Sequence, residues 1–336
     1  MILRAASSVY GAATRWRRRW YGADPRRRRR LARPVVSIGN LRVGGSGKTP
    51  LVAHIARLLI DRGERPAILS RGYARRVSSD EVTIVSDGTR VLADLDHAGD
   101  EPLMLARALT GVPVLVGRDR HRSGRVAEDR LGATLHLLDD GFQHVELERD
   151  VDLLAISEDD LTERLLPAGR LREPLETAAV ADGLLVTASA EGGVARVARA
   201  LGAHSAGVFT VSRALGPLRW VVPAGPLPVP EAGPVVAVSG IARPERFHAD
   251  LAAAGWRVAA TVVFPDHHLF TATDLERVAA TARQASASAV LTTEKDAVRL
   301  ESHPLTGLRV AVVPLVTTVT PVSFVDWLLD RVRTPR

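Results

Sequence analysis

Short runs of apolar, often β-branched residues alternate with stretches of helical periodicity along most of the chain. Helical patterns are expected over residues 49–59, around 102–109 and over 122–131. The strand-like runs before residue 216 are VVSIG, PAILS, EVTIVSD, VPVLVG, TLHLLDD, VDLLAIS and DGLLVTA. Apolar runs that alternate with helices are typical of βαβ units, so this region predicts a mostly parallel sheet flanked by helices.

A second α/β pattern follows a segment rich in proline and glycine, residues 216–234, whose composition is typical of a connector. The later strand-like runs are VVAVSG, RVAATVVF, AVLTTEKD and RVAVVPLV, with helical stretches between them. A length of 336 residues also favours two domains. We therefore predict a larger domain over residues 34–215, the connector, and a smaller α/β domain over residues 235–336.

The first 33 residues have a periodicity of their own. Their apolar residues recur at spacings of four and three, which places them on one stripe of a helix. The stripe consists of Ile2, Ala6, Val9, Ala13, Trp16 and Trp20. Most of the arginines lie off the stripe, and aromatic rings beside arginines are typical of a helix resting on an anionic membrane. We therefore predict that residues 1–33 form a basic amphipathic arm that associates with a membrane.

The net charge of the chain, +7, is concentrated in this arm. Residues 1–33 carry 11 arginines and one aspartate, or +10, whereas the remainder carries 34 basic and 37 acidic residues, or −3. Two other interpretations of the arm stay open: a basic segment for nucleic acid and a solvated tail. A secretory signal is disfavoured because the arginines follow the weak apolar segment instead of preceding it.

The residue inventory narrows the chemistry. The chain has no cysteine, which excludes disulfides, thiolate metal ligands and cysteine nucleophiles, so oxygen or imidazole must hold any metal. No apolar run approaches the roughly 20 residues needed to span a bilayer. Lysine is almost absent from a chain with 45 basic residues: only Lys48 and Lys295 occur. An ammonium retained in so arginine-rich a chain is a candidate for a specific role.

One of these lysines lies in a glycine-rich loop. The stretch SIGNLRVGGSGKTPLVAHIARLL, residues 37–59, consists of a strand-like run, a glycine-rich turn and a helical pattern that opens on Lys48 and Thr49. Such a loop binds phosphates through backbone N–H groups and a helix N-terminus. Lys48 is expected to reach the β- and γ-phosphates, and Thr49 to bind Mg²⁺. Arg42 occupies the place of the usual first glycine, but Gly44, Gly45 and Gly47 still permit close approach of a phosphate.

A second phosphate-site element is expected at the end of another strand. The sequence LHLLDDGFQH places Asp139 and Asp140 directly after a strand-like run, where a carboxylate that holds Mg²⁺ would lie. An Asp-Gly turn is the structural alternative. In combination with the glycine-rich loop, the magnesium interpretation is favoured.

Three residues are candidates for a catalytic base. Asp100, in HAGDEPLMLARAL, would accept a proton from a substrate hydroxyl or would merely cap the helix that follows it. His267 and His268, in FPDHHLF, lie on an expected loop of the second domain, as a base or as metal ligands. The residues alone do not decide among these roles.

Nine motifs occur in the order found in the tetraacyldisaccharide 4'-kinase family, which phosphorylates a lipid A precursor. They are GNLRVGGSGKTP, SRGYARR, HAGDEPLMLA, VPVLVGRDRHR, LLDDGFQHVELERDVDLL, LLPAGRLREPL, SGIARPERFHADL, FPDHHLF and TTEKDAVRL. The chain resembles this family from about residue 34 to about residue 300. The resemblance implies a P-loop NTPase-like α/β fold, ATP and Mg²⁺ as cofactors, and transfer of the γ-phosphoryl group to the 4'-hydroxyl of tetraacyldisaccharide 1-phosphate, which forms lipid IVA.

The resemblance also implies roles for particular residues. Asp100 is the base, paired with His267, and Lys48 belongs to the catalytic group. The nucleotide-binding residues are Asn40, Gly44, Gly45, Ser46, Gly47, Lys48, Thr49 and Gln143, and the metal ligands are Thr49, Asp139 and Asp140. The residues expected to contact the substrate are Tyr73, Arg118, Arg120, His144, Arg172 and Glu173. Because the acyl chains of such a substrate stay in the bilayer, the resemblance implies that the protein acts at the cytoplasmic face of a bacterial inner membrane, as a peripheral protein.

Two alternative functions stay open at this level. A P-loop NTPase that switches a partner or delivers a metal has a similar loop, and hydrolysis without an added acceptor would favour it. A nucleic-acid-dependent ATPase is less favoured because residues 34–336 carry a net charge of −3, and no nucleic-acid partner is expected. The sequence gives no indication of a protein partner.

Overall fold

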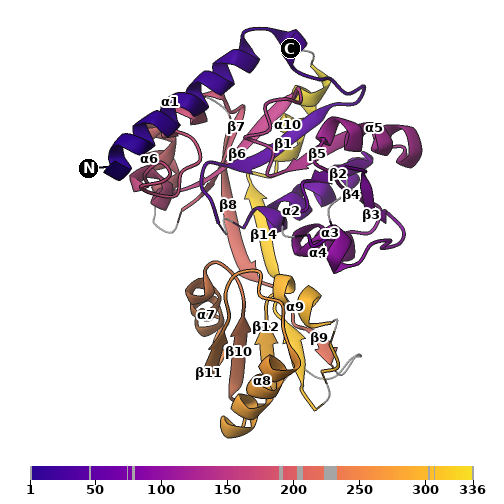
Figure 1. Ribbon diagram of the computed structural model, residues 1–336, viewed down its shortest axis with the longest axis vertical. Coiled ribbons are helices and arrows are strands. Elements are labelled where there is room, and N and C mark those ends of the chain that lie inside the picture. The colour runs from indigo at the N-terminus through magenta and orange to yellow at the C-terminus, as the bar shows by residue number, and fades with distance from the viewer. Residues whose placement is uncertain are drawn as a thin grey trace.

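The computed structural model describes residues 2–44, 47–73, 75–77, 80–188, 192–202, 207–222, 233–301, 303–305 and 307–334. Two α/β domains lie one above the other, and two neighbouring strands, β8 (Val208–Leu215) and β14 (Leu315–Thr320), run from one to the other (Figure 1). The expected fold class, an α/β protein with a mostly parallel sheet and a smaller α/β domain, is confirmed.

The larger domain is built on a nine-stranded sheet with the order β14-β8-β7-β6-β1-β5-β2-β4-β3. All neighbours are parallel except the edge pairs β3–β4 and β8–β14. Its other strands are β1 (Val35–Asn40), β2 (Pro66–Ser70), β3 (Thr83–Asp87), β4 (Pro113–Val116), β5 (Leu135–Asp139), β6 (Val151–Ser157) and β7 (Gly183–Thr187). Strand β1 is buried along its whole length between β5 and β6. Ligands of such sheets bind beyond the carboxyl ends of the central strands, so β1 and β5 point at the expected site.

Helices cover this sheet as the sequence patterns indicate. The expected helices at 49–59, 102–109 and 122–131 are found: the first is longer by one residue at each end, the second starts two residues earlier and ends one earlier, and the third starts two residues earlier. The α-helices of the larger domain are α2 (Lys48–Ile60), α3 (Leu95–Ala98), α4 (Asp100–Ala108), α5 (Arg120–Leu131), α6 (Gly193–Ala200) and α10 (Phe324–Arg333). Three short 3-10 helices are η1 (Pro25–Arg27), η2 (Glu158–Thr162) and η3 (Leu175–Val180). One face of α2 is fully buried in the main hydrophobic core, which fixes the direction of the loop before it.

The smaller domain has a five-stranded sheet with the order β11-β10-β12-β13-β9. Its strands are β9 (Arg219–Val222), β10 (Val235–Ser239), β11 (Val258–Val263), β12 (Ala289–Thr292) and β13 (Val310–Val312), and its helices are α7 (Pro244–Ala253), α8 (Ala272–Gln284) and α9 (Glu294–Leu300). Only β9 is antiparallel to its neighbour. Helix α9 lies at the top of this domain and packs against α4 of the larger one.

The chain crosses between the domains differently from the expected division. The segment 216–234 contains β9, which joins the small sheet, and residues 223–232 lie outside the described part of the chain. Residues 315–334, expected in the C-terminal domain, return to the large sheet instead: β14 pairs with β8, and α10 buries Phe324 and Leu328 in the main core. An apolar run predicts a strand but not its partner, because pairing depends on residues about 100 positions away.

The N-terminal arm forms helix α1 (Ile2–Gly22), as the stripe predicts, and it lies along the larger domain (Figure 1). The stripe faces outward: Val9 and Trp16 are 71% and 66% exposed. The opposite face contacts the body, where the Ser7 hydroxyl donates to the Leu165 carbonyl and Gly11 packs on Leu165. Among the described residues, no helix is both long and apolar enough to cross a membrane.

Candidate active site

The glycine-rich loop lies where β1 ends and α2 begins. Gly44 and Gly47 have positive φ angles of 86° and 70°, conformations that a residue with a side chain rarely adopts. Gly47 immediately precedes α2, so Lys48 and Thr49 open the helix and its N-terminal N–H groups face the loop. The two remaining loop residues of the prediction, Gly45 and Ser46, lie outside the described residues. The local geometry suits phosphate binding.

Arg42 does not take over the role of the missing glycine. Its guanidinium is mostly buried and turned toward η2, 3.4 Å from Asp160 and 3.6 Å from Glu163. These two carboxylates offset its charge, and its backbone forms a bridge with Leu171. The phosphate-binding turn therefore starts at Gly44, two residues later than in the usual pattern.

Lys48 belongs to a polar network at the carboxyl ends of β1 and β5. Its ammonium donates to Asn40 Oδ1 at 2.7 Å and lies 3.2 Å from Asp140. Arg172 donates to both Asp140 oxygens, at 2.7 and 2.8 Å, and to Asn40. Burial raises the pKa of Asp140, but Lys48 and Arg172 outweigh it and hold that pKa well below the ordinary range. Asp140 is therefore a carboxylate that orients both cations.

Asp139 has a different environment, although it is the neighbouring residue. It ends β5 beside Ile38 of β1, it is 4% exposed, and the Ser70 hydroxyl lies 3.4 Å from it. Burial, helped by the charges of Glu101 and Asp140, raises the pKa of Asp139 to about 7. A buried carboxylate without a tightly bound cation of its own is suited to a metal ion.

The residues present fit a magnesium-nucleotide complex. Thr49 is nearly buried at the start of α2, and Asp139 supplies a carboxylate at the end of the adjacent strand. Two buried polar atoms nearby, Ser37 Oγ and Gln143 Oε1, have no hydrogen-bond partner among the residues that the structure describes. The described residues contain no group of three or more acidic or histidine side chains that could hold a metal alone. Mg²⁺ commonly binds through one or two protein oxygens together with phosphates, so such a group is not required.

A second polar group connects the two domains. Asp100 opens α4, and its buried carboxylate lies 2.9 Å from His267 Nδ1. Gly99, not Asp100, occupies the N-cap position of α4, but Asp100 Oδ1 accepts from the Glu101 N–H in the first turn at 3.0 Å, so the side chain contacts both the helix terminus and His267. Burial raises the pKa of Asp100, but the hydrogen bond from His267 and the charges of Lys295 and Arg299 bring it below the ordinary value. Asp100 is therefore ionised at neutral pH, as a base must be.

The neighbouring histidine is held elsewhere. His268 Nε2 lies 2.9 Å from Asp274, the N3 residue of the capping box that opens α8, and its ring stacks on Phe264 with centroids 4.7 Å apart. His267 has a positive φ of 60°, which turns its ring toward Asp100 and the larger domain. The tertiary contacts therefore separate two histidines that the sequence leaves equivalent.

The expected substrate residues fall into two groups. Near the site, Tyr73 is 70% exposed and meets the His267 ring edge-on at 5.4 Å. Arg120 begins α5 and is buried with Arg71 nearby, which lowers its pKa to about 10, and Arg118 just before it is exposed. Burial and the charge of Arg120 lower the pKa of His144 to about 4, so His144 is neutral.

Glu173, which was expected to contact the substrate, contacts a residue of the arm in the structure. Its buried carboxylate accepts two hydrogen bonds from Arg18 of α1, at 2.8 and 3.1 Å. Arg18 also donates to the Phe142 carbonyl, in the loop that carries Asp139 and Asp140. The contacts of Glu173 and Arg18 therefore join the arm to the active-site loop. In the same loop, Gln143 donates to the Asn40 carbonyl at 3.0 Å, which connects the loop to the end of β1.

The comparisons with known proteins agree with this geometry. A family model described as Tetraacyldisaccharide-1-P 4'-kinase matches residues 1–333. The chain belongs to this family. A tetraacyldisaccharide 4'-kinase from Geobacter metallireducens is 40% identical over 307 residues, covering 89% of this chain and 88% of the relative. Another, from Anaeromyxobacter dehalogenans, is 43% identical over 284 residues, covering 81% and 73%.

A solved structure extends the likeness to the fold. The crystal structure of LpxK from Aquifex aeolicus in complex with ATP matches with a TM-score of 0.78 and 30% identity, covering 98% of both chains. The chain is thus an ATP-binding phosphotransferase of the tetraacyldisaccharide 4'-kinase family, and the alternative of a partner-switching NTPase is not favoured.

Three residues near the kinase site were not assigned a role from the sequence. Arg213 of β8 lies against the phosphate-binding loop, because a Cβ on Gly47 would be 3.1 Å from its guanidinium. Arg299 of α9 is buried 3.9 Å from Asp100. Lys295 contacts His267 and was singled out only by its rarity. Arginine is too common in this chain for Arg213 or Arg299 to give any signal in the sequence.

The different contacts of the two histidines predict different mutant phenotypes. We expect His267→Ala to lower the kcat of the kinase by about ten- to a hundredfold, because it removes the hydrogen bond that orients Asp100. We expect His268→Ala to lower the melting temperature and to leave kcat within about threefold, because it contacts only its own domain. Steady-state kinetics and thermal unfolding of both variants would check this; equal losses of kcat would contradict it.

Proposed function

We propose that the chain transfers the γ-phosphoryl group of ATP to the 4'-hydroxyl of tetraacyldisaccharide 1-phosphate, which forms lipid IVA. The observation that best supports this is Asp100, a buried carboxylate with a lowered pKa, beside a site that offers Lys48 and Asp139. Hydrolysis needs only a positioned water, whereas a sugar hydroxyl benefits from a base whose proton affinity is controlled.

The residues divide the work of such a transfer. Lys48 and the start of α2 bind the phosphates, and Asn40 and Asp140 hold the ammonium of Lys48 in place. Mg²⁺, held by Thr49 and Asp139, would supply charge neutralisation on the phosphates when it is bound. Asp100 accepts the proton of the 4'-hydroxyl as its oxygen forms the bond to phosphorus, and ADP leaves with the electron pair of the broken bond. His267 keeps the carboxylate oriented.

The activity can be tested directly. Labelled γ-phosphate from ATP should appear in the lipid when the protein is incubated with Mg²⁺ and tetraacyldisaccharide 1-phosphate in mixed micelles. The same mixture without the lipid should release little phosphate. Release of phosphate at the same rate with and without lipid would reject the kinase in favour of the hydrolysing NTPase.

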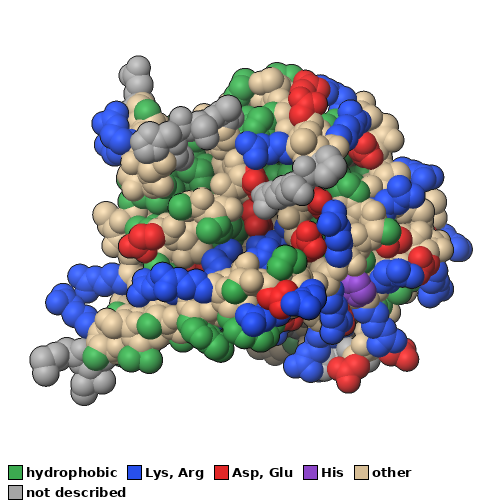
Figure 2. Space-filling model, turned by 90° about the horizontal axis from the view of Figure 1, so that it is seen from above, with side chains coloured by type: hydrophobic (Ala, Val, Ile, Leu, Met, Phe, Trp, Pro, Cys, Tyr) green, Lys and Arg blue, Asp and Glu red, His purple; other side chains and the backbone are tan. Residues whose placement is uncertain are grey.

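We also propose that α1 places the enzyme on the cytoplasmic surface of the inner membrane as a peripheral protein. Figure 2 shows basic and hydrophobic side chains close together along this helix. The exposed apolar residues of the helix are Leu3, Val9, Trp16 and Trp20. Exposed rings beside arginines favour an anionic lipid surface over water. The contacts of Arg18 with Glu173 and Phe142 would hold the active-site loop close to that surface.

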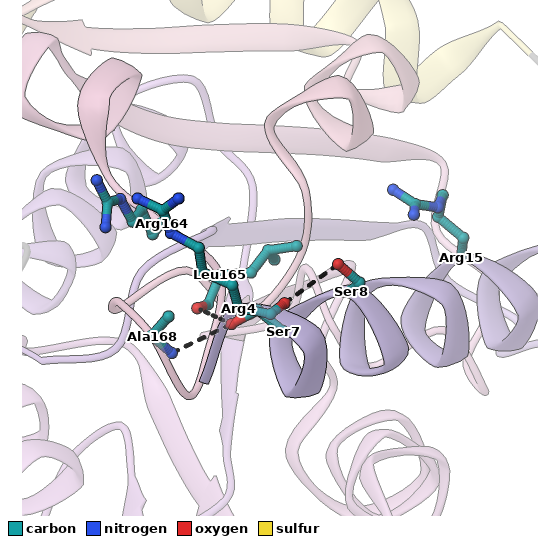
Figure 3. A pocket seen from close by; sticks show the side chains of 7 residues that line it. All are labelled: Arg4, Ser7, Ser8, Arg15, Arg164, Leu165 and Ala168. Atoms are coloured by element: carbon teal, nitrogen blue, oxygen red, sulfur yellow. Dashed lines mark hydrogen bonds between the residues drawn. The ribbon is translucent and has the colours of Figure 1, made fainter. Parts of the chain in front are cut away.

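A basic hollow beside the helix supports the same proposal. It has a volume of about 400 Å³ and lies between α1 and the loop 164–168. Arg4, Arg15 and Arg164 line it together with Ser7 and Ser8, as Figure 3 shows. Three guanidinium groups around one hollow suit an anionic phosphate group.

Membrane attachment through the outward stripe predicts a selective loss of liposome binding. Replacing Leu3, Val9 and Trp16 by serine should weaken binding to anionic vesicles at least about tenfold, because each side chain loses its lipid contact. Activity on detergent-dispersed substrate should change much less. Val322→Ser, which alters a residue that is 80% exposed between β14 and α10, is the control. Unchanged vesicle sedimentation of the triple variant would reject the arm as a membrane contact. Deleting residues 1–33 is a poorer test because it also removes the buried Leu31.

A further inference from the structure

Lys295 lies at the centre of the polar group that joins the domains. Its ammonium is 3.1 Å from His267 Nε2, 3.2 Å from Asp266 Oδ1 and 3.5 Å from Glu101. It comes from the first turn of α9, and its side chain is 17% exposed. The ammonium also lies 3.9 Å from Asp100 Oδ2, the oxygen that contacts Nδ1 of the same ring.

The chemistry of the two groups fixes the positions of the hydrogens. An ammonium has three N–H donors and no acceptor, so His267 Nε2 must accept in this contact. A neutral imidazole that accepts at Nε2 carries its hydrogen on Nδ1, which then donates to Asp100 Oδ2 at 2.9 Å. Lys295 has acceptors on His267 and Asp266 within hydrogen-bond distance, and the carboxylates of Glu101 and Asp100 lie slightly farther away. The arrangement admits only one neutral tautomer.

The other charges around the ring do not perform this selection. Asp100 and Glu101 approach from α4, Asp266 from the same loop as His267, and Lys295 and Arg299 from α9, while Tyr73 meets the ring edge-on. Arg299 donates hydrogen bonds to the carbonyls of Gly240 and His268 and to Asp296. In the described part of the chain, Lys295 is the residue whose hydrogen-bond donor contacts His267 Nε2.

We propose that Lys295 is a positioning residue that holds His267 as the neutral Nδ1–H tautomer. The inference rests on the proposed function, in which Asp100 is the base. With one hydrogen bond donated by Nδ1 to Oδ2, Asp100 stays oriented and keeps lone pairs for the proton of the sugar hydroxyl. Without Lys295, Nε2 accepts a proton from solvent, and the imidazolium makes the adjacent carboxylate a weaker base. Lys295 thus positions Asp100 through His267, and its charge also lowers the pKa of Asp100 directly.

The test compares two variants that each remove one cation between α4 and α9. Lys295→Met removes the donor to His267. Arg107→Met removes the ion pair between Arg107 of α4 and Glu301 after α9, and it leaves His267 untouched. A merely structural latch between the helices predicts the same result for both. Nitrogen-15 NMR of histidine-labelled enzyme reports the hydrogen on each ring nitrogen, without requiring any turnover.

We expect His267 in the wild type and in Arg107→Met to give the Nδ1–H pattern at neutral pH, and in Lys295→Met to give mixed tautomers or imidazolium. In lipid phosphorylation, kcat of Lys295→Met should fall about ten- to a hundredfold with KM for ATP nearly unchanged. The acidic limb of its kcat profile should also move to higher pH, because the ammonium no longer lowers the pKa of Asp100. Lys295→Arg keeps a donor and should restore the tautomer at least in part.

Two outcomes would overturn the proposal. The first is an Nδ1–H pattern in Lys295→Met identical to that of the wild type, and the second is the same loss of kcat in both methionine variants. A wild-type enzyme that gives the Nδ1–H pattern but phosphorylates no lipid would instead contradict the proposed function, so the two failures are distinguishable. A fall in the ATP affinity of Lys295→Met with an unchanged pH profile would reassign the lysine to phosphate binding.

Discussion

Replacing Asp100 by asparagine is expected to reduce kcat by about two to four orders of magnitude, with ATP affinity unchanged within about twofold. Asparagine has nearly the same shape, and its one carbonyl oxygen can accept the hydrogen bond from His267 or the one from the Glu101 N–H. It cannot accept a proton at neutral pH, so the sugar hydroxyl must react without a base. Single-turnover phosphorylation of the lipid with pre-bound ATP measures the chemical step directly.

The control for this variant is Glu101→Gln, which removes the adjacent carboxylate from the same turn of α4. Because the pKa of Asp100 lies below the ordinary value, the carboxylate should stay ionised as the pH falls to the ordinary range of aspartate, and the base should be lost only below it. A wild-type kcat in Asp100→Asn would leave this residue with a structural role alone and would sink the base assignment.

Replacing Lys48 by alanine should abolish most turnover, with less than about a tenth of the activity remaining, a difference of at least about 1.4 kcal/mol in the barrier. The ammonium lies at the start of α2, where it is expected to reach the transferred phosphate and to neutralise charge that develops there. Its removal also leaves Asp140 facing Arg172 alone. Both effects act at the reacting group, so the loss should appear in kcat and not only in KM.

Arg57→Ala is the matched control, because Arg57 lies on the exposed side of α2 and donates to the Ala108 carbonyl. It removes a positive charge from the same helix without touching the loop. Full activity there together with the loss in Lys48→Ala would assign the effect to the phosphate site. More than about a tenth of the activity in Lys48→Ala would reject the loop assignment.

The proposed base, Asp100, is oriented by residues of the other domain. Asp100 belongs to the larger domain, while His267, Lys295 and Arg299 belong to the smaller one. Only β8 and β14 are continuous between the domains in the described chain. The oriented base therefore exists only when the domains are apposed as they are here, and any separation of the two would expose an unpaired carboxylate.

The sequence predicts the phosphate site well because its signals are local. The strand, the glycines and Lys48 with Thr49 follow each other within a dozen residues, and the backbone conformation of Gly44 and Gly47 is a local requirement. The placement of Asp139 at the end of β5 follows from a short apolar run. The amphipathic stripe likewise predicts α1 by itself.

Tertiary structure decides which distant residues meet. Asp100 and His267 are 167 positions apart, and Arg18 and Glu173 are 155 apart, so no periodicity relates them. The return of β14 to the large sheet, the choice of His267 over His268 and the contact that gives Lys295 a role all depend on how domains pack. A hydrophobic pattern specifies the buried face of each element but not its partner, because the free energy of burial is the same whichever apolar surface covers it.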